Sequence, residues 1–275
     1  MWAQISCVCR RFFIFGFMTV QEILDTVYAA YHKPEYIYPD PLAPVRTYPE
    51  VRDREIAGLV ASSLAVGRVD LILKAVDQVL SPLGPHPAGV IGKLSLKDLQ
   101  NQYKGFVYRF FKCREISSFL YAIGEALRQY GSLEALFMEH YIPGHMVPAI
   151  SSFLAFIQKY SKDCCGILVT PPEKGSACKR FNLFLRWMVR QDSVDPGGWN
   201  RVSRRDLLVP VDTHMHDIAT RLGFTCRRAG DLKTAQEITD SFAQYDPDDP
   251  VRYDFSLTRL GIHPDLDKSI LDKLT

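Results

Sequence analysis

The 275-residue chain lacks a strong charge of either sign, since 33 lysine and arginine residues nearly balance 31 aspartate and glutamate residues. A net charge of +2 excludes a strongly basic, histone-like nucleic-acid binder, although it permits a local basic patch. The chain also lacks internal repeats and low-complexity stretches, and 47% of its residues are hydrophobic. This composition excludes wholesale disorder and predicts a globular protein with ample material for a core.

The sequence has no apolar run long enough to cross a membrane, which takes about 20 residues. The apolar stretch at residues 12–18 is far shorter, and no small-residue cleavage site follows it, so it does not indicate a secretory signal. Residues 18–22 read as a protein start that opens a helix, and we interpret residues 1–18 as a non-native or disordered extension. The expected protein is soluble, cytoplasmic and monomeric, without membrane contact.

The seven cysteines lack the regular spacing of a disulfide framework. Cys164 and Cys165 are adjacent, and Cys7 and Cys9 are too isolated to hold a metal ion. A reducing cytosol is the simpler setting for this pattern. The spacing therefore predicts neither a disulfide framework nor a metal site.

Strand signals are nearly absent, because the one β-like run, at residues 166–169, stops at Pro171. Without alternation of strand and helix, doubly wound and TIM-barrel folds are disfavoured. The dominant hydrophobic period is helical and predicts an all-α protein of about ten helices. A box formed by Ser95 and Asp98 opens a short helix. The other predicted helices cover residues 20–31, 52–66, 69–80, 115–130, 132–141, 146–160, 176–190, 212–222, 232–245 and 249–260.

Basic residues concentrate between positions 174 and 233, where twelve lysines and arginines accompany six aspartates. The window carries a charge of +6, and the rest of the chain therefore carries −4. An asymmetry of this size favours a side that faces a polyanion. A solvated face with scattered arginines would have the same composition.

The first segment of chemical interest begins at Gly175 and Ser176, which read as a turn and a helix N-cap. A helix start offers unpaired N–H groups and a positive dipole end, which suit a phosphate. Lys179 is expected in the first turn, where desolvation and the neighbouring cations Lys174 and Arg180 favour a neutral, nucleophilic amine. An exposed helix-start lysine with no chemical role would show the same spacing.

The second segment covers residues 209–223 and places Asp212 directly after Val-Pro-Val. Asp212 is the natural N-cap of the next helix, and capping alone would account for it. Together the two segments resemble the helix-hairpin-helix superfamily of base-excision DNA glycosylases. There, a helix opens with Gly-x-Lys-x-x-Asn before aliphatic residues, and the matching stretch here is residues 179–185, which supply the Lys-x-x-Asn part and the apolar residues after it. A Val-Asp-Thr-His motif then leads into a helix that ends near Arg-Leu-Gly, matched by residues 211–214 and 221–223.

The likeness extends over roughly residues 20–262. The chain looks most like a poorly characterised bacterial family allied to the archaeal 8-oxoguanine DNA glycosylases. Its signatures are Asp-Arg-Glu at residues 53–55, the run at residues 174–180, Tyr-Asp-Phe at residues 253–255 and Arg-Leu-Gly at residues 259–261. The resemblance implies an all-α, two-lobed bundle of the helix-hairpin-helix glycosylase type, with residues 19–275 forming one domain and a cleft between its lobes.

Three departures from the superfamily stand out. Residues 171–175 replace its Leu-Pro-Gly-Val-Gly loop, and residues 65–68 lack the glutamine that wedges into DNA. Only Cys226 follows Asp212 in place of a four-cysteine cluster, so neither an iron–sulfur cluster nor any other cofactor is expected. These changes bear on the lesion recognised more than on the fold.

The resemblance implies a glycosylase and abasic-site lyase that flips a damaged base, such as 8-oxoguanine, out of duplex DNA. Lys179 would attack C1′ of the deoxyribose, while Asp212 would stabilise the oxocarbenium-like charge and assist proton transfer. Asp254 would read an N–H edge of the base between the stacking rings of Tyr253 and Phe255, unless those rings pack in the core.

The remaining assigned residues are expected to hold the substrate. Arg186 lies two turns after Lys179 on the same helix face and, with Arg68, is assigned to substrate binding. The DNA backbone is assigned to Lys174, Gly175, Ser176 and Arg180. Trp187 is expected in the core.

Two other functions fit parts of the sequence. A non-catalytic helix-hairpin-helix nucleic-acid-binding protein would keep the basic face and use neither Lys179 nor Asp212 chemically. A metal-dependent hydrolase would use Asp212, His214 and His216 as ligands. Only 59 residues follow His216, too few for the barrel that this motif normally begins, and side chains two apart on a helix diverge.

Overall fold

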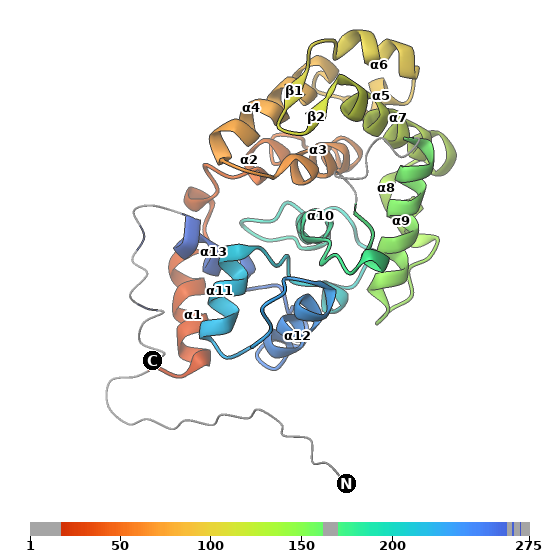
Figure 1. The fold of residues 1–275 in the computed structure, drawn as a ribbon. Coiled ribbons are helices and arrows are strands. Elements are labelled where there is room, and N and C mark those ends of the chain that lie inside the picture. The colour runs from red at the N-terminus through yellow and green to blue at the C-terminus, as the bar shows by residue number, and fades with distance from the viewer. Residues whose placement is uncertain (1–17, 162–169, 263–265, 267–269, 271–275) are drawn as a thin grey trace.

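The computed structural model describes residues 18–161, 170–262, 266 and 270. In these ranges the chain is predominantly helical, as predicted, with one two-stranded hairpin formed by β1 (Val107–Tyr108) and β2 (Phe111–Lys112) (Figure 1). The α-helices are α1 (Val20–Tyr31), α2 (Leu42–Val45), α3 (Val51–Leu64), α4 (Val69–Leu80), α5 (Pro87–Ile91), α6 (Leu96–Gln102), α7 (Cys113–Tyr130), α8 (Leu133–Met138), α9 (Met146–Tyr160), α10 (Lys179–Val189), α11 (Thr213–Arg221), α12 (Leu232–Ala243) and α13 (Asp254–Ile262).

Two predictions concern residues outside these ranges. The interpretation of residues 1–18 as an extension falls outside them except for Met18, and the β-like run at residues 166–169 falls outside them entirely. No helix of the described part combines the length and hydrophobicity needed to span a bilayer.

Local capping fixes several helix starts where the sequence predicts them. Thr19 and Glu22 form a capping box at α1, in which each side chain accepts a hydrogen bond from the other residue's backbone N–H. Ser95 and Asp98 form the same box at α6. Such caps use residues only three apart, so the sequence alone reveals them.

Three of the differences from the prediction concern elements near the candidate site. Helix α10 begins at Lys179 and not at residue 176, because Ser176 pairs with Asp231 in an isolated bridge and Cys178 turns the chain with a φ of 47°. Helix α13 begins at Asp254 and not at residue 249, because turns occupy the intervening residues. The strands of the hairpin have two residues each, too few to show the period of a strand.

Helix α10 runs through the middle of the molecule, as Figure 1 shows, between α2–α7 on one side and α1 with α11–α13 on the other. It packs on α3, where Gly58 permits a close approach: a Cβ at that position would lie 3.3 Å from the Phe184 ring. Helix α13 packs on both α1 and α11. The centre is filled by an aromatic cluster of Phe137, Phe153, Phe181, Phe184 and Trp199.

The Asp-Arg-Glu motif of α3 fastens this helix to its surroundings. Asp53 accepts a hydrogen bond from the backbone N–H of Ala88 at the start of α5. Arg54 donates to four backbone carbonyls in the loops on either side. Glu55 accepts from two N–H groups at the start of α8 and from the indole of Trp199. The motif therefore has a structural role in positioning α3.

Candidate functional site

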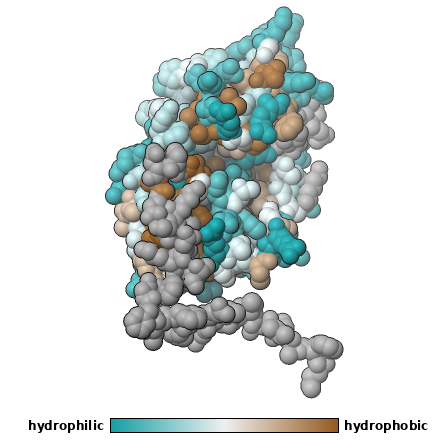
Figure 2. Space-filling view, turned by 60° about the vertical axis from the view of Figure 1, so that its left-hand side comes forward, coloured by the Kyte–Doolittle hydropathy of each residue, from teal (hydrophilic) through white to brown (hydrophobic). Residues whose placement is uncertain are grey.

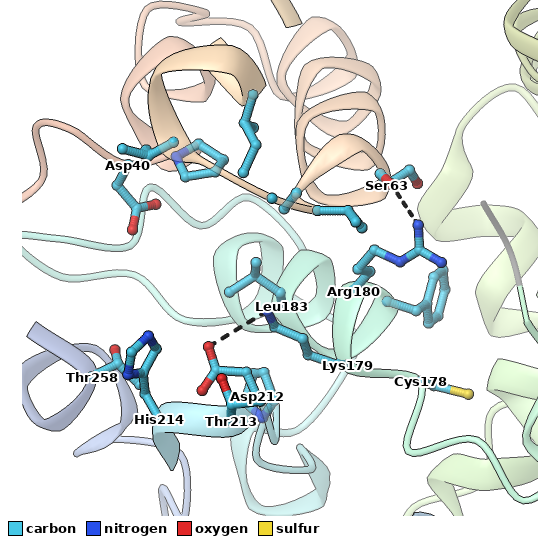
Figure 3. Close-up of a pocket in the computed structure, with 18 of the residues that line it drawn as sticks. Asp40, Ser63, Cys178, Lys179, Arg180, Leu183, Asp212, Thr213, His214 and Thr258 are labelled. Atoms are coloured by element: carbon cyan, nitrogen blue, oxygen red, sulfur yellow. Dashed lines mark hydrogen bonds and ion pairs between the residues drawn. The ribbon is translucent and has the colours of Figure 1, made fainter. Parts of the chain in front are cut away.

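A cavity of about 770 Å³ lies beside α10. Its wall combines the turn between α3 and α4, the hairpin, the first half of α10, the start of α11 and helix α13 (Figure 3). The volume is typical of small-molecule pockets, which run from about 300 to 1,000 Å³. Charged side chains line the cavity together with apolar ones, and they are Asp40, Lys179, Arg180, Arg186, Asp212, Asp254 and Arg259.

Lys179 and Asp212 lie together at this wall although 33 positions separate them. Lys179 is the first residue of α10 and Asp212 is the N-cap of α11. The Lys179 Nζ is 3.5 Å from Oδ2 of Asp212, and the two side chains are 35% and 17% exposed (Figure 3). The start of α10 and the start of α11 thus meet with an amine and a carboxylate in contact.

Asp212 makes a second interaction through its other oxygen. Its Oδ1 accepts a hydrogen bond of 2.8 Å from the backbone N–H of Met215, which confirms the predicted N-cap of α11. One oxygen therefore holds the helix start, and the other faces Lys179. Capping and ion pairing coexist in one carboxylate.

Of the two cations expected beside Lys179, the structure describes the side chain of Arg180. Arg180 points away from Lys179 and donates to the carbonyl of Ser63, 2.9 Å away, at the end of α3 (Figure 3). Desolvation lowers the pKa of Arg180. The ionic partner of Lys179 is instead the carboxylate of Asp212. Any nucleophilic use of the amine consequently requires a proton acceptor, and Asp212 is in reach.

The residues predicted to open α10 lie upstream of its start. Gly175 has a φ of 77° and ends a short 3₁₀ turn, while Ser176 accepts a hydrogen bond from the N–H of Cys178 and lines the cavity. Gly175 thus forms the predicted turn, whereas the predicted N-cap role of Ser176 was wrong, because Cys178 is the N-cap of α10. The side chain of Lys174 lies outside the described part of the structure.

Arg186 and Asp254 meet deep in the cavity wall, each 3% exposed. Arg186 pairs with Asp254 and, at 3.2 Å, with Asp195. The other carboxylate oxygen of Asp254, Oδ1, is buried and has no hydrogen-bond partner among the described residues. Burial raises the pKa of Asp254, while the Arg186 guanidinium opposes this rise. Asp254 thus presents an acceptor with unused capacity.

The predicted aromatic stack around Asp254 does not form. Tyr253 and Phe255 are each 1% exposed and belong to the core, which is the alternative that the sequence left open. Neither ring lines the cavity. Trp187 is fully buried, as predicted.

Several cavity residues had no assigned role in the sequence analysis. Arg259 pairs with Asp40 at 2.6 Å, and its Nε is buried without a hydrogen-bond partner in the described ranges. Phe110 also lines the cavity. The pairing of Asp40 with Arg259 joins residues far apart in the chain, so no local signal predicts it.

Arg68 lies at the rim and not in the wall. Its guanidinium is 78% exposed and pairs with Asp70, while its neighbours Gly67 and Val69 line the cavity. The basic window at residues 174–233 is likewise dispersed. Its arginines form ion pairs with acidic residues at several separate places, namely Arg186, Arg190, Arg205, Arg221 and Arg227.

The geometry gives the metal-hydrolase alternative no support. The Nε2 of His216 lies 2.9 Å from the carbonyl of Arg227, away from the cavity lining that includes His214. In the described ranges, no three histidine, cysteine or acidic residues are grouped so that they could hold a metal ion.

Comparison with known proteins identifies a family and no individual relative. No curated protein and no solved structure matches the chain. One family model, described as a protein of unknown function (DUF2400), matches residues 40–263, which include every charged residue of the cavity wall. The chain therefore belongs to the DUF2400 family, whose function is unknown.

Proposed function

We propose that this protein is a DNA glycosylase and abasic-site lyase with the two-lobed, helix-hairpin-helix type of bundle. The observation that carries the proposal is the contact of 3.5 Å between the Lys179 amine and the Asp212 carboxylate at the wall of a large cavity. Glycosidic bonds are cleaved by such pairs, in which one group attacks and a carboxylate supports charge and proton transfer.

The chemical step uses both groups. After the Lys179 ammonium passes a proton to Asp212, the Nζ attacks C1′ of an extruded nucleotide. The Nζ–C1′ bond forms while the glycosidic C–N bond breaks, and its electron pair leaves with the base, which takes up the proton held by Asp212. Asp212 then carries a proton from Nζ to the ring oxygen O4′, and the C1′–O4′ bond breaks to give a protonated imine between Lys179 and the sugar. Loss of a C2′ proton then expels the 3′ phosphate and breaks the strand.

The base would occupy the deeper part of the cavity. Arg186 lies seven residues after Lys179 on α10, so both side chains reach the same cavity about two turns apart. The unused Oδ1 of Asp254 is suited to accept a hydrogen bond from an N–H group of the base. Arg186 holds Asp254 in place and is therefore a positioning residue. This arrangement favours bases with an N–H edge.

The start of α10 at the cavity supports an anionic ligand. Helix α10 has no side-chain N-cap bond, and its first residue, Lys179, lines the cavity. The positive end of a helix dipole attracts phosphate groups within the first turn. A sugar–phosphate backbone passing over the start of α10 would place C1′ beside Lys179.

The test is incubation of the protein with duplex oligonucleotides that carry 8-oxoguanine, uracil, an alkylated base or an abasic site. We expect strand scission on at least one of them, and covalent trapping of the protein on that DNA by borohydride. Lys179→Gln should abolish trapping while leaving DNA affinity within about threefold. Trapping that persists in this variant would show that Lys179 is not the nucleophile. Salt-sensitive binding without scission by the wild-type protein would instead indicate a non-catalytic nucleic-acid binder.

A further inference from the structure

The hairpin formed by β1 and β2 is fixed to the rim of the cavity. Its two-residue turn consists of Arg109 and Phe110, because Tyr108 pairs with Phe111 in the register of the strands. The hydroxyl of Tyr108 donates to the carbonyl of Val66, next to the turn between α3 and α4. Phe111 is 1% exposed and anchors the hairpin in the core. The turn is therefore held rigidly at the cavity.

Phe110 at this turn is exposed and yet belongs to the cavity. Its side chain is 62% exposed, whereas most aromatic side chains of the described part are buried or half-buried. Phe110 also lines the cavity that contains Lys179 and Asp212. An exposed phenyl ring at the rim of a polar cavity gains free energy only when a ligand covers it.

Arg109 adds a positive charge and a strained backbone at the same point. Its φ is 53°, a conformation that is uncommon for residues other than glycine and costs free energy. The guanidinium carbon lies 5.6 Å from the centre of the Phe110 ring. No carboxylate in the described ranges forms an ion pair with Arg109. A glycine would adopt this conformation without strain, so arginine at this position costs backbone free energy.

We propose that Phe110 inserts into the base stack of duplex DNA where the nucleotide has left it, and that Arg109 contacts the adjacent phosphate. This inference rests on the proposed function. A ring pressed between base steps compensates for the stacking that extrusion removes. It acts as a positioning residue, because it keeps the nucleotide in the cavity without touching the reacting atoms.

The observations favour a base stack over a protein partner at this place. A protein docking site needs a contiguous apolar patch of several hundred Å². The face in Figure 2 mixes hydrophilic and hydrophobic residues instead of presenting one broad apolar surface. The hairpin turn offers one aromatic ring beside one cation, which matches a nucleic acid, in which each base lies beside a phosphate.

The test uses a duplex that carries a tetrahydrofuran abasic analogue next to 2-aminopurine, whose fluorescence falls when a ring stacks on the base. The variants are Phe110→Ala, Phe110→Trp and the control Ile142→Ala, in which a similarly exposed apolar residue lies outside the cavity lining. We expect Phe110→Ala to lose the fluorescence decrease that the wild type causes on binding, and to lose about 10- to 100-fold in excision rate on duplex lesions. On single-stranded lesion DNA its rate should equal that of the wild type. Phe110→Trp should restore both readouts.

The outcomes separate the two proposals. If wild-type protein processes the lesion duplex and Phe110→Ala matches it within twofold in both rate and fluorescence, the insertion is wrong and the proposed function stands. If Phe110→Ala lowers the excision rate by the same factor on single-stranded and duplex DNA, the ring does not act by stacking, and the inference is overturned. If the wild-type protein binds neither duplex, both proposals fail.

Discussion

At the residue scale, the carboxylate of Asp212 makes both a helix-cap hydrogen bond and a contact with Lys179. Its Oδ1 accepts the N–H of Met215 and stabilises the start of α11, while its Oδ2 lies 3.5 Å from Lys179. A carboxylate bound on both sides has little freedom to rotate. The helix cap therefore also sets the direction in which the second oxygen faces the amine.

Two substitutions of Asp212 separate its role as the N-cap of α11 from its role beside Lys179. Asparagine is as good an N-cap as aspartate, so Asp212→Asn should change the free energy of unfolding by less than about 0.5 kcal/mol. Asp212→Ala removes the cap and should cost about 1 kcal/mol. Under the proposed function, both variants should lose strand scission, because neither has a carboxylate beside Lys179. Urea unfolding together with the scission assay measures both effects.

The same two variants can also contradict the catalytic role proposed for Asp212. If Asp212→Asn keeps full scission activity while Asp212→Ala only loses stability, the residue is a cap and nothing more. In that case, the contact with Lys179 is an ion pair without chemical use.

Lys179 and Asp212 could be predicted as site residues from the sequence, whereas the interactions of the residues around them could not. Lys179 and Asp212 each occur in a recognisable local motif. The unused oxygen of Asp254 depends on its pairing with Arg186, 68 positions away, and such a pairing has no local signature. The hydrogen bond from Arg180 to the carbonyl of Ser63 joins residues 117 positions apart, so it has no local signature either.

At the element scale, Glu55 joins three parts of the fold. It lies in the middle of α3, and its two oxygens accept N–H groups from the start of α8 and from the indole of Trp199. Burial raises the pKa of Glu55 to about 7, because desolvation outweighs these three donors. Its proton is therefore held more tightly in the folded protein than in the unfolded chain.

Stability should fall with pH because of this carboxyl group. The contribution of Glu55 is fully present below its ordinary pKa of 4.5 and is lost as the pH rises through about 7. Glu55→Gln is neutral at every pH and removes the dependence. The unfolding free energy of wild type relative to this variant should drop by roughly 2 to 3 kcal/mol between pH 5 and pH 8. Urea unfolding at both pH values measures it.

A partly buried helix carboxylate whose pKa is lowered provides the control. Glu125 forms an ion pair with Arg128 on α7, and this contact lowers its pKa. Glu125→Gln should therefore show no such drop relative to wild type. A difference between wild type and Glu55→Gln that stays constant or grows with pH would mean that Glu55 is ionised in the folded protein.

The elements follow the sequence where their signals are local. The boundaries of α1, α4 and α9 agree with the predicted residues, since hydrophobic periodicity specifies them and a capping box also fixes the start of α1. The start of α10 does not, because a bridge between Ser176 and Asp231 holds the preceding residues extended. The hairpin was missed because its pairing is shorter than the pattern that reveals a strand.

At the scale of the whole molecule, buried charges connect α10 to the chain that follows it. Arg190 is 3% exposed and pairs with Asp192, Asp195 and Asp249. Arg186, one turn earlier, pairs with Asp195 and Asp254. Asp195 thus bridges two arginines without contact with solvent. Arg186 and Arg190, which belong to the basic window at residues 174–233, therefore pair with acidic residues inside the protein.

Substitution of one residue in this buried ion-pair network should lower the stability of the whole protein. Arg190→Met leaves buried carboxylates without their partner and should lower the free energy of unfolding by about 3 to 5 kcal/mol. The exposed pair of Arg205 with Asp248 offers a matched control, and Arg205→Met should cost less than about 1 kcal/mol. Chemical unfolding of both variants measures the difference. Equal small losses would show that the buried network contributes no more than a surface pair.

Helix α10 is tied to three different neighbours along its length: Lys179 to the start of α11, Arg180 to α3 and Arg186 to α13. The cavity beside α10 cannot widen without breaking one of these charge-assisted interactions. Under the proposed function, the cost of distortion then falls on the nucleic acid and not on the protein. Selection among lesions becomes a matter of base-pair strength: a loosely paired nucleotide enters readily, and a well-paired one is turned away before any bond is cut.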